Sequence, residues 1–196
     1  YLAGMIRGDG MIFHGTYPSK SRTREIHSFR LALIDDEALE RTRLFLDDEG
    51  VPTRTRPFAV ATNTRSAADA IHTAARHHVE TVESLVQTPD APDADWYAGF
   101  LAGIFDAEGS CSQGVLRISN KDAEIIALVE RGLRIFAIPH VVEDPRPNGV
   151  RCVRVVGGLP SRQRFFAICS PAITRKLSIE GTAVKSVADL RVIEIT

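Results

Sequence analysis

The sequence predicts a mixed α+β fold in which one αββαββα unit occurs twice, related by a pseudo-twofold axis. A short motif recurs, because residues 1–10 read YLAGMIRGDG and residues 100–109 read FLAGIFDAEG. A longer block recurs in the same order, because residues 29–52 align without a gap on residues 116–139. Apolar residues alternate in short strand-like runs beside amphipathic helical runs. Two recurring blocks in one order indicate duplication of a structural unit rather than chance.

The elements of each copy follow in order from these patterns. A first helix ends at an acid and a glycine, Asp9-Gly10 in one copy and Glu108-Gly109 in the other. Strands are expected near 11–15, 27–33, 53–60, 111–113, 115–119 and 140–156. Amphipathic helices carry apolar faces that include Ala38, Leu39, Leu46, Ile125, Val129 and Leu133. Last helices are expected near 66–86 and 161–169, and the extra residues of the first copy fall near 15–27.

The repeat divides the chain into two subdomains, residues 1–86 and 96–180. The polar, proline-containing stretch 87–95 is interpreted as a linker, and 181–196 as a C-terminal tail. Because the chain begins inside the first motif, it is expected to be an excised fragment.

Composition indicates a globular domain with enough apolar residues for a core. Of 196 residues, 44% are hydrophobic and 25% are charged, which excludes intrinsically disordered and collagen-like classes. The three cysteines are too few and too scattered for a disulfide framework, so they are expected to be buried thiols. No apolar run approaches the ~18 residues of a membrane span, so no membrane partner is expected. Charge is uneven, since residues 1–95 carry 11 Lys and Arg against 15 Asp and Glu, and residues 96–196 carry 13 against 10.

Small residues step by four along both motif helices. Gly4 and Gly8 share one helix face, as do Gly99, Gly103 and Ala107. A glycine inside a helix costs about 1 kcal/mol relative to alanine, so a compensating close approach of two backbones is expected. The partner of one motif helix would then be the other. The alternative is that these glycines mark loops.

The acids that end the two motifs are the main candidates for chemistry. Asp9 and Glu108 lie at the negative ends of their helix dipoles, each before a glycine suited to a left-handed cap. If the helices pack side by side, the two carboxylates repel each other, and a divalent cation would reverse that repulsion. Carboxylates, backbone carbonyls and water are the ligands that Mg²⁺ prefers. The alternative is a pair of solvated acids without a role.

The paired decapeptides resemble the motif of the LAGLIDADG homing endonucleases, and the chain resembles their monomeric, double-motif type. The resemblance implies two antiparallel sheets that form a DNA-binding saddle. It also implies hydrolysis of one phosphodiester on each strand of a long asymmetric double-stranded DNA target, leaving 3′ overhangs. The chain departs from the motif at Arg7, where an Asp is usual, whereas Asp106 keeps that position in the second copy.

The resemblance also implies a set of active-site residues. Asp9 and Glu108 would bind Mg²⁺, with Mn²⁺ as a substitute, and the backbone carbonyls of Gly8 and Ala107 would assist. Asn120, Lys121 and Lys176 match polar and basic side chains that such proteins carry around the site. The alternative for either lysine is a solvated surface cation. In the first copy Leu33 and Ile34 align with Asn120 and Lys121, and Arg76, His77 and His78 lie near the position expected to match Lys176.

Strand alternation indicates the surface that would face DNA. Phe29, Leu31 and Leu33 point one way and Ser28 and Arg30 the other, and the run 116–121 alternates in the same manner. Arginines on an open sheet face can read guanine edges in the major groove. The expected DNA-binding residues are Arg22, Arg24, Arg30, Arg54, Arg56, Arg117, Ser119, Arg151 and Arg154. Any one of these arginines alone would equally well serve solubility.

The leading hypothesis is a monomeric, Mg²⁺-dependent, site-specific DNA endonuclease that acts in the cytoplasm. The first alternative is a degenerate member of the same fold that acts as an RNA-splicing maturase or a DNA-binding regulator without cleavage. Because residues 181–196 resemble the segment that follows the endonuclease in inteins, an intein origin is plausible, and a third alternative is an inert intein insert. Retention of both motif acids favours the enzyme.

Overall fold

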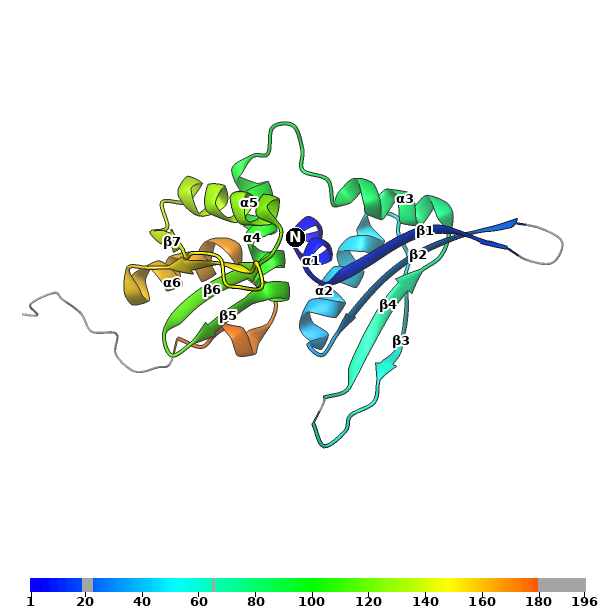
Figure 1. Ribbon diagram of the computed structural model, residues 1–196, viewed down its shortest axis with the longest axis horizontal. Helices are drawn as coiled ribbons and strands as arrows, with labels where there is room; N and C mark the ends of the chain where they lie inside the picture. Colours follow the sequence, from blue (N-terminus) through cyan, green and yellow to red (C-terminus); the bar gives the residue numbers. More distant parts are fainter. Residues whose placement is uncertain (19–22, 65, 180–196) are drawn as a thin grey trace, which may run out of the picture.

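The computed structural model describes residues 1–18, 23–64 and 66–179, and it shows two units of the same plan side by side (Figure 1). The first unit consists of α1 (Leu2–Asp9), β1 (Gly10–Pro18), β2 (Thr23–Leu33), α2 (Asp36–Asp48), β3 (Arg54–Ala59), β4 (Ala68–Thr73) and α3 (Arg76–Leu85). The second unit consists of α4 (Ala94–Glu108), β5 (Gly109–Ser112), β6 (Val115–Asn120), α5 (Ala123–Ile135), β7 (His140–Val142), β8 (Arg151–Val155) and α6 (Gly158–Cys169), followed by the 3₁₀ turn η1 (Thr174–Leu177). The predicted tail 181–196 lies outside the described residues.

Each unit contains one four-stranded sheet with the same connectivity. The strand order is β1-β2-β4-β3 in the first unit and β5-β6-β8-β7 in the second, and all neighbours are antiparallel. In each unit the helices that follow the second and fourth strands pack on one face of the sheet (Figure 1). The predicted mixed fold of two αββαββα units is therefore confirmed.

The alternation of apolar residues decides which face of each sheet is buried. Phe29 and Leu31 of β2 are fully buried, and so are Leu116 and Ile118 of β6, as the sequence predicts. Each unit has its own apolar core beneath its helices. The faces that carry Arg30 and Arg117 are left open.

Helices α1 and α4 pack against each other at the centre of the molecule, between the two sheets (Figure 1). A Cβ added to Gly4 would overlap the backbone of α4 at Phe100 O and Ile104 N. A Cβ added to Gly103 would overlap the carbonyl oxygen of Tyr1 and, at 2.7 Å, the amide nitrogen of Met5. The predicted close approach of the two motif helices is therefore correct.

The glycines after the two acids do not form the left-handed caps that the sequence predicts. Gly10 has φ −78° and Gly109 has φ −87°, which is extended backbone, and each begins a strand directly. Glycine is required there by space rather than by φ. A Cβ on Gly10 would lie 2.6 Å from Ile6 O, and one on Gly109 would overlap the ring and carbonyl of Phe105.

The expected helix 66–86 is wrong in its first part. Residues 68–73 form β4, a central strand paired with both β2 and β3, and α3 begins only at Arg76. The run ADAIHT has little strand alternation of its own. Pairing with β2 places Ala70 and Ile71 in buried positions, so tertiary pairing overrides a weak helical preference.

A segment of the second unit completes the core of the first. We name residues 170–177 the arm, because they leave the end of α6 and cross to the first unit. Ala172 and Ile173 are 9% and 1% exposed, and both belong to the apolar cluster that contains Met5, Leu31 and Leu39. The arm of the second unit therefore completes the apolar core of the first unit.

Among the described residues, none of the helices has both the length and the apolar composition needed to cross a membrane. Cys152 and Cys169 are buried free thiols, as expected, and Cys111 is half-buried. Burial raises the pKa of the Cys169 thiol to about 12.

Gly103→Ala should destabilise the protein by about 1–3 kcal/mol, because the new methyl group overlaps backbone atoms of α1 that cannot move independently. Gly132→Ala in α5 is the matched control. Its Cβ would meet side-chain atoms of Leu101 and Tyr97 at 3.0–3.2 Å, and alanine gains helix propensity, so its net change should be within ~1 kcal/mol. Urea unfolding measures the free energy of unfolding of both variants. An equal decrease in the two would contradict the close helix contact at Gly103.

Candidate functional site

Asp9 and Glu108 meet where α1 and α4 end beside each other. They are the last residues of the two helices, and each is followed directly by the first strand of its unit. The helices are so close here that a Cβ on Gly8 would lie 2.5 Å from Ala107 Cβ and 3.4 Å from Glu108 Cγ. The small residues that precede the acids thus allow the two carboxyl groups to approach.

The environment of the two acids disfavours their negative charge. Desolvation raises the pKa of the Glu108 carboxyl, and the charge of Asp9 raises it further, while Lys176 acts in the opposite direction. Desolvation also raises the pKa of Asp9, again opposed by Lys176. Like charges held at the negative ends of two helix dipoles are the arrangement that a bound cation relieves.

The arm brings Lys176 to the end of α4. Its Nζ donates to the carbonyl oxygens of Asp106 at 2.5 Å, Phe105 at 3.3 Å and Ala107 at 3.5 Å, which are among the last acceptors of the helix. Desolvation lowers the pKa of this ammonium group. The cation therefore lies on the carbonyl groups directly before Glu108.

Asn120 reaches the site, whereas Lys121 does not contact it. Asn120 Nδ2 donates to Glu108 Oε1 at 3.3 Å, and Asn120 Oδ1 accepts from the Asp122 amide at 2.8 Å. Lys121 follows the last residue of β6 and is exposed, and among the described residues it makes no hydrogen bond or ion pair. The two neighbouring residues that the resemblance groups together therefore occupy different surroundings.

Among its described residues, the first unit offers no equivalent of this lysine near Asp9. Leu33, which aligns with Asn120, is buried, and Ile34 is an exposed apolar side chain. The expected match of Arg76, His77 and His78 to Lys176 is wrong, because these residues form the first turn of α3 whereas Lys176 follows the last turn of α6. The two halves of the site therefore differ chemically.

The donors around the acid pair fit a divalent cation such as Mg²⁺. Two carboxylates and the nearby carbonyls of Gly8 and Ala107 are oxygen ligands of the kind such ions prefer. Within the described residues no three His, Cys, Asp or Glu side chains form a cluster able to hold a metal alone. An ion at this pair would need water or substrate oxygens to complete its coordination.

The motif position that holds Arg7 in one unit and Asp106 in the other fixes the segment that follows each last helix. Asp106 is 2% exposed, and its carboxylate accepts from the Ala172 amide at 2.7 Å, the Ile173 amide at 3.0 Å and the Tyr1 hydroxyl at 2.9 Å. Arg7 instead donates to Thr88, which follows α3, at 3.2 Å. Arg7, which replaces the usual Asp of the motif, thus donates to a side-chain hydroxyl, whereas Asp106 accepts from two backbone amides.

Acids at the start of α2 and α5 form ion pairs with Arg175 and Arg7. These contacts were not identified from the sequence. Asp35 accepts from Arg175 Nε and Nη2, both at 2.6 Å, while Glu124 lies 3.1 Å from Arg7. The hydrogen bond from Arg175 holds the pKa of Asp35 below its usual range. The available signal was the repeat itself, since Asp35 and Asp122 occupy the same position in the aligned blocks.

The open face of the first sheet is basic with apolar side chains between the cations. Register places Arg30, His72 and Arg54 in one row across β2, β4 and β3, and Arg56 lies on the same face. Desolvation and the charges of Arg56 and Arg54 lower the pKa of His72. The Arg30 guanidinium lies 4.7 Å from the Phe58 ring centroid. Arg24 also faces this side, and Arg22 lies outside the described residues.

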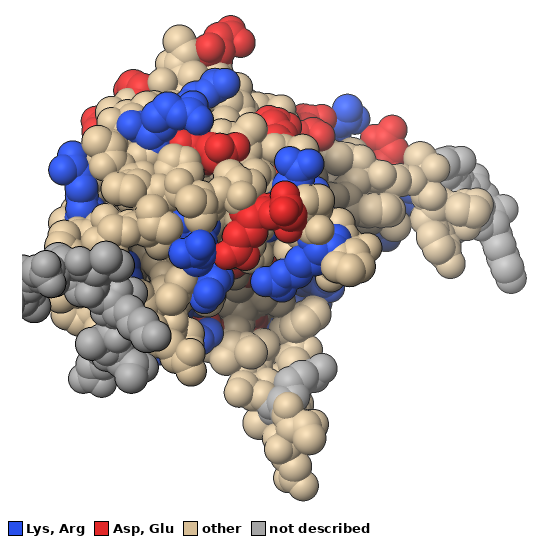
Figure 2. Space-filling model, turned by 60° about the vertical axis from the view of Figure 1, so that its left-hand side comes forward, with Lys and Arg blue, Asp and Glu red and all other residues tan. Residues whose placement is uncertain are grey.

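The second sheet carries fewer free cations on its open face. Arg117 pairs in register with Arg154, and Ser119 lies on the same side of β6 as Arg117. Arg154 forms an ion pair with Glu143 at 2.9 Å. Arg151 is opposite Asn120 and therefore points to the other side of the sheet from Arg154, so these two arginines do not share a face. Around the second unit, Lys and Arg are interspersed with Asp and Glu (Figure 2).

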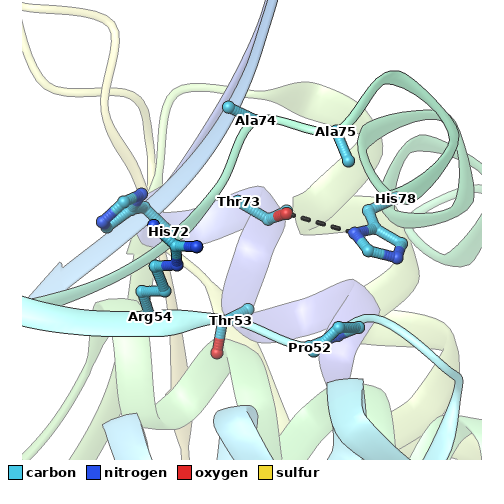
Figure 3. A pocket seen from close by; sticks show the side chains of 8 residues that line it. All are labelled: Pro52, Thr53, Arg54, His72, Thr73, Ala74, Ala75 and His78. Atoms are coloured by element: carbon cyan, nitrogen blue, oxygen red, sulfur yellow. Dashed lines mark hydrogen bonds between the residues drawn. The ribbon is translucent and has the colours of Figure 1, made fainter.

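A pocket of about 450 Å³ lies at the end of the first sheet, between β3, β4 and the start of α3 (Figure 3). Arg54 and His72 contribute basic groups to it. Thr73 Oγ1 and His78 Nδ1, which also line it, are hydrogen-bonded at 3.3 Å. None of its lining residues belongs to α1 or α4. It extends the basic face and is separate from the acid pair.

Comparisons with known proteins agree with this architecture. Residues 95–167 match a family model described as a LAGLIDADG-like domain. The solved structure of I-DmoI in complex with DNA and Mn superposes with a TM-score of 0.68 at 19% identity, covering 86% of this chain and 94% of that chain. No curated protein matches the sequence.

A second group of similar structures comes from another kind of protein. The N-terminal LAGLIDADG domain of DUF199/WhiA superposes with a TM-score of 0.61 at 18% identity, covering 86% of this chain and 78% of that chain. Full-length DUF199/WhiA from Thermatoga maritima gives a TM-score of 0.60 at 20% identity, covering 90% of this chain and 55% of that chain. These likenesses show the fold: the chain has the fold of the double-motif LAGLIDADG homing endonucleases, and the predicted resemblance is confirmed.

Asp9→Asn should stabilise the metal-free protein at pH 7–8 by about 0.3–1 kcal/mol, because it removes a disfavoured charge from a helix C-terminus. The pKa of Asp9 is raised on folding, so its penalty applies above the folded-state pKa and disappears as pH falls through it. The advantage of the variant should therefore shrink in acid. Thermal unfolding from pH 8 to pH 4 measures this, and an advantage that grows in acid would contradict it.

Proposed function

We propose that this chain, whose fold is that of the LAGLIDADG homing endonucleases, is a site-specific endonuclease of double-stranded DNA that uses a divalent metal ion. The observation that carries the proposal is the pair Asp9 and Glu108, held together by α1 and α4 with a lysine and an asparagine beside them. An uncompensated acid pair at two helix ends is costly without a bound cation. The DNA complexes of I-DmoI support the choice of DNA as substrate.

Asp9 and Glu108 would hold the metal, Mg²⁺ in the proposal with Mn²⁺ as a substitute, and the carbonyls of Gly8 and Ala107 would assist. A bound ion would polarise the scissile phosphate and lower the pKa of the attacking water. I-DmoI structures with Mn, Mg and Ca support the use of a divalent ion. The proposal includes one cut in each DNA strand that leaves 3′ overhangs.

The polar side chains of the second unit have distinct parts in this mechanism. Asn120 donates to Glu108 Oε1, which leaves the other carboxylate oxygen free for a metal ligand role. Lys176 carries a positive charge next to Glu108 and would offset the charge that develops on the phosphate. Lys121, which makes no contact to the acids, is a candidate only for binding the DNA backbone.

The two open sheet faces would bind the DNA on either side of the acids. The row of Arg30, His72 and Arg54 with Arg56 can contact phosphates and guanine edges of one half-site. The second sheet offers Arg117 and Ser119. Because the two faces differ in charge, the target is expected to be asymmetric. A DNA target implies a location with DNA, which we place in the cytoplasm.

A DNA-binding regulator without cleavage is the second candidate. The structural likeness to WhiA favours it, and so does the lack of a lysine near Asp9 among the described residues of the first unit. Against it stand both motif acids with their paired geometry. Cleavage of candidate targets in Mg²⁺ separates the two functions.

Asp9→Asn and Glu108→Gln should each reduce double-strand cleavage by at least about 10³-fold, because each removes a charge that would hold the metal. Binding of the target should persist and weaken with salt, at a slope near −0.9 per neutralised phosphate. Cleavage of end-labelled DNA and binding titrations in Ca²⁺ measure the two effects. Full cleavage by the double variant would overturn the assignment.

Lys176→Met should slow cleavage of one DNA strand by about 10²-fold and slow the other less, because among the described residues only the second unit supplies a lysine to the acids. A nicked intermediate should accumulate. Lys121→Met is the matched control and, at saturating DNA, should have little effect on the cleavage rate of either strand, since Lys121 does not contact the acids. Equal slowing of both strands in strand-resolved time courses would contradict the asymmetry.

A further inference from the structure

The arm that carries Lys176 is held by both units, because Asp106 of α4 accepts from its Ala172 and Ile173 amides while residues of the first unit make further contacts to it. Arg41 of α2 donates to the Ser170 carbonyl at 2.6 Å, where α6 ends. Ile173 is buried in the core of the first unit. The Thr174 amide donates to Glu37 Oε2 at 3.3 Å. These contacts fix the path of the arm along the start of α2.

The strongest of these anchors lies directly beside the lysine. Arg175 donates from Nε and Nη2 to the two oxygens of Asp35, both at 2.6 Å, which is the paired geometry that gives an arginine–carboxylate contact its directionality. Asp35 makes no side-chain hydrogen bond to the start of α2, so its carboxylate is committed to the arm. The Asp35 side chain is 16% exposed and the Arg175 side chain is 65% exposed, so water screens the contact from the arginine side.

The next residue, Lys176, directs its side chain back to the second unit. The Lys176 amide donates to the Ile173 carbonyl at 3.0 Å, which closes the turn η1, and Lys176 Nζ then reaches the end of α4. Arg175 and Lys176 are neighbours in one short turn. A shift of Arg175 therefore moves the Lys176 backbone.

The residue of the second unit that is equivalent to Asp35 makes different contacts. Asp122 occupies the position of Asp35, but its Oδ2 is 3.9 Å from Arg7 Nη2, and its Oδ1 accepts from the Glu124 amide at 2.8 Å. Arg7 belongs to α1, and the segment that passes it, at Thr88, carries no lysine in its next residues, Pro89 and Asp90. Asp122 thus caps its own helix and makes only one long contact to the other unit, whereas both oxygens of Asp35 accept from Arg175 of the arm.

We infer that Asp35 of the first unit is a positioning residue for Lys176 of the second unit's site, acting through Arg175. The inference rests on the proposed function and deepens it: cleavage of the DNA strand that depends on Lys176 requires an intact contact between the two units. Among the described residues, the Asp35 side chain accepts from Arg175 and makes no hydrogen bond to Asp9, Glu108 or Lys176.

The test compares Asp35→Asn, Arg175→Ala and Lys176→Met, with Asp122→Asn as the matched control. Asp35→Asn and Arg175→Ala should slow the same DNA strand that Lys176→Met slows, by about tenfold to a hundredfold. Adding either change to Lys176→Met should slow cleavage of that strand little further, because each single change already removes the contribution of Lys176. Asp122→Asn should leave that strand's rate unchanged.

Slowing of both strands alike, multiplicative losses in the double variants, or an equal effect of Asp122→Asn would each overturn the inference. Amide hydrogen exchange gives a readout independent of cleavage. Asp35→Asn should speed exchange at the amides of Thr174 and Lys176, and Asp122→Asn should not. If the wild-type chain cuts neither strand, the proposed function fails. Unchanged arm exchange in Asp35→Asn would then overturn the positioning role separately.

Discussion

The contact between α1 and α4 is the constraint on which the rest of the molecule depends. Gly4 and Gly103 each face backbone atoms of the opposite helix, so the two helices are closer than any larger residue would allow. This packing brings the last residues of both helices together and turns each following strand outward into its own sheet. Helix packing, the position of the acids and the spread of the two sheets thus have one geometric origin.

The same helix contact places two carboxyl groups close together, and neighbouring side chains offset their repulsion only in part. Two carboxyl groups at adjacent helix ends repel each other, and desolvation raises the pKa of both. Lys176 supplies one nearby positive charge, and Asn120 supplies a neutral donor. Both come from the second unit, so the site is asymmetric although its scaffold is nearly symmetric.

Much of the scaffold could be predicted because it depends on local periodicity and on the repeat. The step of four between glycines predicts the helix contact, and alternation in β2 predicts the burial of Phe29 and Leu31. β4 could not be recognised, because its short run has little pattern and its state is decided by pairing with β2. The need for glycine at position 10 follows from crowding against Ile6, which no sequence pattern shows. The roles of Asp35 and Arg175 depend on a chain crossing between units that lies outside the repeat.

The path of the arm has a consequence for how the protein can be made. Ile173 fills the interior of the first unit, yet it is synthesised about ninety residues after the end of α3, that unit's last helix. The N-terminal half therefore keeps an incomplete interior until the arm has been synthesised. A chain divided between α3 and α4 would yield a first half without the residues that close its own core, so the first of the duplicated units depends on the second for a complete interior.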